Sequence, residues 1–197
     1  MRNEYESNGI VIGVVSSLDD DASLGRIRVR YPHLGNVESD WARLSAPMAG
    51  AQRGAFFRPE VGDEVLVAFE HGDPRRPYIL GSLWSQTDQP PPDDGDKTSN
   101  NWRFIRSRSG HIILLDDTPG KEKIELIDKD GKRRIIIDSA SSPAKITVIA
   151  EIGDIDLKAP QGKISIEAQE INVKASTSLN LEGSTSANLK GKTVNIN

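Results

Sequence analysis

The second half of the chain is built from a short repeat, in which two apolar residues are separated by one residue. The pairs begin at Ile112, Ile124, Ile135, Ile146, Ile155, Ile164, Ile171, Leu179, Ala187 and Val194. The step between successive pairs falls from 12 residues through 11 and 9 to 7 or 8. Residues i and i+2 of a β-strand point to the same face, so each repeat offers two apolar side chains to one side. A short, regular period of this kind indicates a repetitive β-structure.

One copy of this repeat cannot bury its own apolar side chains. Two such residues gain less free energy than the ordering of about eight residues costs. The chain also has no Phe, Tyr or Trp after Phe104, so it lacks the bulky residues that fill a single-chain core. We therefore expect three identical chains to wind around one axis as an intertwined β-prism or β-helix. The residues expected on this axis are Ile155, Leu157, Ile164, Ile166, Ile171, Val173, Leu179 and Leu181. A single-chain meander or β-solenoid is the alternative.

The first half has a different pattern, with strand signals and almost no helix signals. Five segments are expected as strands, namely residues 9–17, 25–32, 40–47, 61–73 and 77–84. Within residues 25–32, Ile27, Val29 and Tyr31 alternate with arginines and are expected to share one face. Five short strands with turn residues between them predict a small closed barrel. Residues 46–60 contain glycines and are expected to form a loop or a short distorted helix.

These patterns predict an all-β protein in five parts. The parts are an N-terminal tail (1–8), a five-stranded barrel (9–85), a linker rich in Pro and Asp (86–101), an antiparallel β region (102–150) and the trimeric β-helix (151–197). Two hairpin turns are expected in the antiparallel region, at residues 118–120 and 130–131.

No residue pattern indicates catalysis or metal binding. The three histidines, His33, His71 and His111, lack the spacing of metal ligands. Residues 93–100 lack the alternating aspartates and final Glu of a calcium loop. We therefore expect no catalytic residue, no cofactor and no bound metal.

Two carboxylate pairs are interpreted as surface charges rather than as the dyad of a glycosidase. These pairs are Asp116 with Asp117, and Glu167 with Glu170. The chain has no cysteine and a net charge of −4, which disfavours thiolate metal sites and a nucleic-acid partner. The basic strand at residues 25–32 offers only Tyr31 as an aromatic partner for a stacked base.

Three stretches of the first half, residues 13–32, 40–47 and 59–84, resemble a known family. They resemble the oligonucleotide/oligosaccharide-binding (OB) type barrel of central spike proteins from contractile injection machines. These are the phage baseplate assembly protein V family and the valine-glycine-repeat (VgrG) proteins of type VI secretion. The motifs that carry the resemblance are Gly25-Arg26, Trp41 with Arg43, Val61-Gly62-Asp63-Glu64-Val65, Gly72-Asp73, and Pro77 ahead of Gly81.

The resemblance implies a non-enzymatic homotrimer in a virion or particle baseplate, assembled in the bacterial cytoplasm. Its barrels would dock on a hub below the tail tube, and its prism would pierce the target envelope. No hub domain precedes the barrel, so the hub is expected to be a separate protein. No histidine follows His111, so we do not expect an iron ion held by a terminal His-x-His pair. We expect instead that a separate proline-alanine-alanine-arginine (PAAR) tip protein caps this end. Arg103, Arg106 and Arg108 are expected to form salt bridges with neighbouring chains or the hub.

Two other functions remain open at this point. One is a carbohydrate-binding or carbohydrate-cleaving β-helix of a tail fibre, and the other is an OB-fold module that binds nucleic acid. The absence of aromatic residues after Phe104 disfavours the first. Phage tail, type VI system and extracellular injection particle also remain open, as do the host, the target cell and any ion or lipid on the axis.

Overall fold

The computed structural model describes residues 9–93 and 98–195, and the regular structure there is almost entirely β. Besides strands it contains two 3-10 turns, η1 (Pro32–Leu34) and η2 (Glu70–Gly72). The all-β prediction is therefore confirmed. Among these residues no helix has the length and apolarity needed to cross a bilayer.

The first unit is a barrel built on one six-stranded sheet in the order β3-β2-β1-β7-β8-β4. Its strands are β1 (Val11–Ser17), β2 (Arg28–Tyr31), β3 (Val37–Glu38), β4 (Arg43–Leu44), β7 (Glu64–Phe69) and β8 (Pro77–Leu83). Neighbouring strands are antiparallel except β4 and β8, which are parallel. A bridge between Ile27 and Ala42 joins the start of β2 to the start of β4 and closes the sheet on itself.

All five predicted segments contain a strand, and the sheet has a sixth that the sequence did not predict. This strand, β3, has only two residues, Val37 and Glu38, and pairs with the end of β2. Two residues are too few to show an alternating pattern.

The interior of the barrel is filled by Val and Ile side chains, together with Ala42 and Tyr31. The buried cluster consists of Val15, Ile27, Val29, Tyr31, Ala42, Val65, Val67 and Ile79. The prediction that Ile27, Val29 and Tyr31 share the buried face is confirmed, because none is more than 4% exposed. Full burial of each aliphatic side chain contributes about 1.5–3 kcal/mol.

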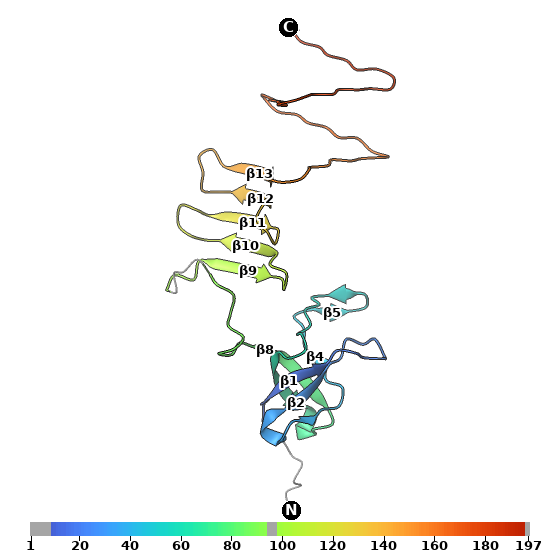
Figure 1. Ribbon diagram of the computed structural model, residues 1–197, viewed down its shortest axis with the longest axis vertical. Helices are drawn as coiled ribbons and strands as arrows, with labels where there is room; N and C mark the ends of the chain where they lie inside the picture. Colours follow the sequence, from blue (N-terminus) through green and yellow to red (C-terminus); the bar gives the residue numbers. More distant parts are fainter. Residues whose placement is uncertain (1–8, 94–97, 196–197) are drawn as a thin grey trace, which may run out of the picture.

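Residues 46–60 form a loop with a small β-hairpin, and the alternative of a distorted helix was wrong. Strand β5 (Ala49–Gly50) pairs with β6 (Arg53–Gly54), and Gln52 adopts a positive φ of 53° between them. Gly54 has a φ of 154°, and a Cβ there would lie 2.6 Å from the carbonyl oxygen of Met48. This hairpin projects from the barrel toward the second sheet (Figure 1).

The second unit is a five-stranded antiparallel meander in the order β13-β12-β11-β10-β9. Its strands are β9 (Trp102–Arg106), β10 (Ile112–Asp116), β11 (Lys123–Ile127), β12 (Arg133–Asp138) and β13 (Lys145–Ala150). Both predicted hairpin turns are present, closed by backbone bonds from Lys121 to Thr118 and from Gly131 to Asp128. Successive strands stack along the long axis of the molecule (Figure 1).

Beyond β13 the described residues 151–195 form one extended segment that crosses back and forth (Figure 1). The repeat predicted strands here, but within one chain these residues form no β-ladder. Nearly every one of them is exposed. The backbone winds onward instead of folding back, so its amide and carbonyl groups have few partners in their own chain. Backbone groups of folded proteins are normally paired, and those of this segment still require partners.

Candidate functional site

One face of the β9–β13 sheet is aliphatic and uncovered. We call it the ladder face, and it consists of Ile105, Ile113, Leu115, Ile124, Leu126, Ile135, Ile137, Ile146 and Val148. These side chains are between 41% and 72% exposed. A contiguous apolar surface of this kind on a folded chain marks an interaction surface.

The strand register arranges the ladder face in two columns. Ile113, Leu126, Ile135 and Val148 lie opposite one another in turn, and so do Leu115, Ile124, Ile137 and Ile146. Each of strands β10 to β13 thus contributes one residue to each column. The predicted start of the first pair, Ile112, was wrong by one residue. The residues that align with the later pairs are Ile113 and Leu115. Ile112 and Leu114 instead point to the opposite face.

That opposite face is covered by the chain's own side chains. Glu125 is 3% exposed and pairs with Lys123 at 2.9 Å and with Arg134 at 3.7 Å. Arg134 also reaches Glu151 at 3.2 Å. Leu114, directly opposite Glu125 in the ladder, is only 3% exposed. The two faces therefore differ sharply, since only the aliphatic one lacks a cover.

The predicted axial residues beyond the sheet are also uncovered within one chain. The first members of the four pairs, Ile155, Ile164, Ile171 and Leu179, are 51–54% exposed. The second members, Leu157, Ile166, Val173 and Leu181, are 67–80% exposed. In each of the four pairs the second member is therefore the more exposed residue. All eight lack an apolar cover within one chain.

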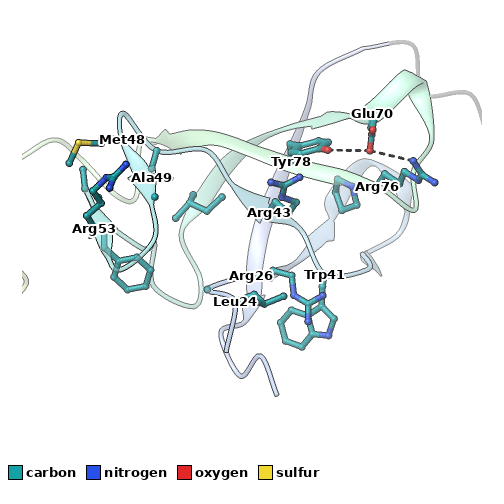
Figure 2. Close-up of a pocket in the computed structure, with 18 of the residues that line it drawn as sticks. Leu24, Arg26, Trp41, Arg43, Met48, Ala49, Arg53, Glu70, Arg76 and Tyr78 are labelled. Atoms are coloured by element: carbon teal, nitrogen blue, oxygen red, sulfur yellow. Dashed lines mark hydrogen bonds and ion pairs between the residues drawn. The ribbon is translucent and has the colours of Figure 1, made fainter. Parts of the chain in front are cut away.

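A second candidate site is a groove of about 1040 Å³ between the β5–β6 hairpin and the barrel. Figure 2 shows arginines and aromatic rings along it, with Trp41 near Arg26 and Tyr78 near Arg43. The Arg43 guanidinium lies 5.6 Å from the centre of the Tyr78 ring. Arg28 lies 4.6 Å and Arg26 5.7 Å from the centre of the Trp41 ring. These distances suit cation–π contacts.

Most charges in and around the groove are paired. Arg26 donates to Asp20 at 2.6 Å, and this bond holds the pKa of the Asp20 carboxyl well below its usual range. Arg75 pairs with Asp73 at 2.8 Å, and this hydrogen bond lowers the pKa of Asp73 to about 2.

The remaining arginines of the groove fall into two kinds. Arg76 lies 3.6 Å from Glu70, which also accepts a 3.1 Å bond from the Tyr78 hydroxyl. Arg43 and Arg53 have no carboxylate within ion-pair distance among residues 9–93 and 98–195. Within the part of the chain that the structure describes, the groove therefore has two arginines without an ion-pair partner.

The aromatic residue that the basic strand itself offers, Tyr31, does not lie beside the strand's arginines. Tyr31 lies in the barrel core, where burial raises the pKa of its hydroxyl to about 12. The ring that stacks on the strand's arginines is Trp41, which follows β2 by ten residues. The sequence signal was the Trp41-x-Arg43 motif, but nothing in it indicated which ring would meet which guanidinium.

The structure does not bring the histidines together. His33 lies in η1 and His71 in η2, and His111 accepts a 3.1 Å bond at Nδ1 from the Lys129 amide. In the part of the chain that the structure describes, no three His, Cys, Asp or Glu residues form a metal-sized group. The stretch compared with a calcium loop includes residues 94–97, which lie outside the described residues.

The two carboxylate pairs lie on different parts of the chain. Burial raises the pKa of Asp116, but hydrogen bonds from Thr118 and Trp102 outweigh it and leave that pKa below its ordinary value. Glu167 and Glu170 are exposed in the extended segment, where Glu170 accepts a 2.8 Å bond from Asn172. Neither pair borders the groove.

Two of the three arginines expected to reach neighbouring chains or a hub instead find partners in their own chain. Arg103 pairs with Asp117 across the β9–β10 edge. Arg108 pairs with Glu60 of the barrel at 3.0 Å, and both side chains are more than half exposed. Exposed pairs of this kind contribute little stability. Arg106 has no ion pair within the described ranges.

Comparison with known proteins identifies one family model and several relatives. Residues 11–84 match the family model of the type VI secretion system/phage-baseplate injector OB domain. The actin cross-linking toxin VgrG1 of Vibrio cholerae is 34% identical over 110 residues, covering 52% of this chain and 10% of the toxin. The spike protein VgrG3 of Vibrio cholerae is 32% identical over 112 residues, covering 53% of this chain and 11% of VgrG3.

A third relative, the spike protein VgrG1a of Pseudomonas aeruginosa, is 27% identical over 128 residues. That match covers 59% of this chain and 20% of VgrG1a. The chain therefore matches between a tenth and a fifth of the length of these three relatives.

Proposed function

We propose that the chain is one subunit of a homotrimeric central spike, on the basis of the match of residues 11–84 to the injector OB-domain family model and of the similarity to VgrG spike proteins. The observation that carries the proposal is the uncovered ladder face and its continuation through the extended segment. The nine ladder-face residues and the eight predicted axial residues are aliphatic and exposed in a single chain. Identical chains would supply the surface that covers them.

Three copies of the chain would cover one another's exposed aliphatic side chains. In each layer three chains bring two apolar side chains apiece to a shared axis, which gives six. The small polar spacers between pairs, mostly Ser, Thr, Lys, Asn and Gly, let each chain turn from one face of the prism to the next. The extended backbone of one copy then pairs with that of its neighbours, which also removes exposed sheet edges.

The role that follows from this assembly is mechanical. A spike transmits the push of a contracting sheath to a small area of the target's outer membrane. Intertwined strands supply stiffness, and no single chain can leave without breaking the pairing of the other two. The polar outside keeps the shaft from adhering to lipid.

The partners of the two ends differ. We place the baseplate hub at the barrel and a PAAR-type tip protein at the far end of the ladder, with assembly in the bacterial cytoplasm. The proposed function is non-enzymatic, although one relative is named as an actin cross-linking toxin. The match to that toxin covers only a tenth of it.

The trimer is tested by light scattering and one substitution. The wild-type chain is expected at about 65 kDa, three times 21.5 kDa, and as an SDS-resistant trimer. Ile166→Asp places three like charges on the axis and is expected to abolish the trimer. The matched control is Ser165→Asp, because residue 165 points away from residue 166 on an extended chain. A solitary 21.5 kDa particle for the wild type would overturn the proposal.

The tip partner is tested separately. Pull-down with the full-length chain is expected to recover a small tip protein, and deletion of residues 187–197 is expected to lose it. Equal recovery with the shortened chain would contradict the tip assignment and leave the trimer untouched.

A further inference from the structure

The groove between the β5–β6 hairpin and the barrel is lined by none of the ladder-face residues. We propose that it binds an extended, acidic segment of a partner protein. The segment pairs with the hairpin through its backbone and places carboxylates on Arg43 and Arg53. This contact is independent of the trimer proposed above, because it uses a surface of one barrel only.

The groove has the size and the walls of a site for an extended peptide. Its volume of about 1040 Å³ is at the upper end of the range for small-molecule pockets. Its walls include both residues of β4 and all four residues of β5 and β6. Strand β4 ends the six-stranded sheet, and β5 and β6 form a separate sheet of two strands. The open edges of such short strands offer backbone groups to an added strand.

The β5–β6 hairpin lacks apolar cover from its own chain. A hairpin of two strands is at best marginally stable in water when nothing packs against it. Met48 and Phe56 flank the hairpin, Leu24 lies in the loop before β2, and all three line the groove. Each is more than half exposed. Apolar side chains of a bound segment would cover them.

Two guanidinium groups of the groove are available to carboxylates. In the described parts of the chain, Arg43 and Arg53 have no carboxylate within ion-pair distance. Figure 2 shows them at separate points, Arg53 on the hairpin and Arg43 on the barrel. Guanidinium–carboxylate bonds are among the stronger hydrogen bonds of proteins. In an extended segment every second side chain shares a face, so a segment that alternates acidic and apolar residues fits these walls.

The position of the Arg53 side chain depends on a glycine of the opposite strand. A Cβ at Gly50 would lie 2.9 Å from Nε of Arg53 and 3.2 Å from its Cζ. The guanidinium therefore lies directly against the backbone of β5. A methyl group at residue 50 would displace this cation without removing its charge.

The aromatic rings of the groove favour a peptide over a nucleic acid. Single-stranded nucleic acids bind by stacking bases on aromatic rings. Trp41 already meets the Arg28 guanidinium at 4.6 Å, and Tyr78 meets that of Arg43 at 5.6 Å. Among the described residues of the lining, only the ring of Phe56 has no cation beside it. One ring offers a base little stacking, whereas two unpaired guanidinium groups suit carboxylates.

Titration of the full-length chain with labelled peptides tests the site by fluorescence anisotropy. The probe is a short blocked peptide of alternating Asp and Leu, and its control is a peptide of alternating Asn and Leu. The Asp peptide is expected to bind saturably, with a Kd that rises with salt concentration because the contacts are ionic. No saturable binding of the Asp peptide, or equal affinity for the Asn peptide, would overturn the proposal.

Three variants of the chain locate the binding site. Arg43→Gln/Arg53→Gln is expected to raise the Kd of the Asp peptide at least about tenfold. Gly50→Ala, which displaces the Arg53 guanidinium, is expected to give a smaller increase. Arg106→Gln/Lys129→Gln removes the same charge from exposed residues outside the groove and is expected to leave the Kd nearly unchanged. Equal losses from the groove and control double variants would indicate non-specific attraction and contradict the assignment.

Two further titrations distinguish other occupants. An oligothymidylate is expected to bind less tightly than the Asp peptide; the reverse order, with loss of binding in Arg43→Gln/Arg53→Gln, would make the groove a nucleic-acid site instead. Asp19 and Asp21 are exposed in the loop before β2 and have no ion pair within the described ranges. Asp19→Asn/Asp21→Asn is expected to leave the affinity for the Asp peptide unchanged. An increase would make this loop of a second copy the occupant and rule out the partner protein.

The outcomes are separate from those for the proposed function. A trimer by light scattering that does not bind the Asp peptide overturns the groove contact and leaves the trimer standing. A monomeric chain that binds the peptide, and loses it with Arg43→Gln/Arg53→Gln, overturns the trimer and leaves the groove contact standing.

Discussion

Ile113 and Leu126 lie directly opposite each other on strands β10 and β11, yet 47% and 43% of these residues remain exposed. In most two-layer folds such a pair would face a second layer of the same chain. Here the same chain covers only the other side of the sheet, where Leu114 and Glu125 are each 3% exposed. One face of the sheet is therefore covered within the chain and the other is not. Substitutions on the two faces can be compared for this reason.

The first prediction compares neighbouring residues of β13. Val148 is 56% exposed on the ladder face, whereas Thr147 points to the covered face. Val148→Asp is expected to change the stability of an isolated chain by no more than about 0.5 kcal/mol, as for other exposed positions. In a trimer it would bury three carboxylates together and is expected to abolish assembly, measured by light scattering.

Thr147→Asp is the control for that variant and is expected to remain trimeric. If Val148→Asp also remained trimeric, the ladder face would not be the interface. A trimer lost equally with both variants would point to damage of the sheet rather than to a specific contact.

The second prediction concerns two glycines of the barrel. A Cβ at Gly13 would lie 3.0 Å from Cγ2 of Val29 and 3.2 Å from Cγ2 of Val67, both in the buried cluster. Gly13→Ala is expected to lower the free energy of unfolding by about 1–3 kcal/mol through overpacking. Gly81→Ala, in β8, meets no atom within 4 Å and is expected to be neutral or slightly stabilising. Chemical denaturation of both variants measures the difference, and equal losses would contradict the packing argument.

The barrel core could be predicted from the sequence because the pattern that specifies it is local. Ile27, Val29 and Tyr31 alternate with arginines within one strand, and alternation fixes which side chains share a face. Strand β3 and the β5–β6 hairpin were missed because two-residue strands have no periodicity.

The ladder shows a second limit of sequence reasoning. The run from Ile112 to Leu115 is apolar at four successive positions, so both phases of a strand are compatible with it. The antiparallel register with β11 decides between them, and it places Ile113 and Leu115 on the open face. The groove was missed for a related reason, since Arg43 and Tyr78 meet through the parallel β4–β8 pairing of residues far apart in sequence.

The third prediction follows from the buried hydroxyl of Tyr31. Burial raises the pKa of Tyr31 to about 12, above the value of about 10 in an unfolded chain. The neutral phenol is favoured in the fold, so its contribution is fully present below about pH 10 and is lost as the pH rises toward 12. The denaturation midpoint of the barrel is expected to fall over that range. Tyr31→Phe is expected to weaken this fall, and an unchanged alkaline profile would contradict the assignment.

The fourth prediction concerns the loop before β2, which Asp20 organises. Its carboxylate accepts bonds from the amides of Ala22, Leu24 and Arg26, as well as from the Arg26 guanidinium. These bonds lower the pKa of Asp20, so their contribution is present above the unfolded value of about 3.9 and is lost as the pH falls. Asp20→Asn is expected to lower the denaturation midpoint at neutral pH, with a difference from wild type that narrows in acid.

Trp fluorescence is a suitable probe for this loop, because Trp41 stacks on both Arg26 and Arg28. Asp19→Asn is the matched control, since in the described residues only the Asp20 side chain binds these amides. The control is expected to leave the midpoint unchanged at neutral pH. A difference between Asp20→Asn and wild type that stays constant from neutral to acid pH would show that the carboxylate's charge is not what holds the loop.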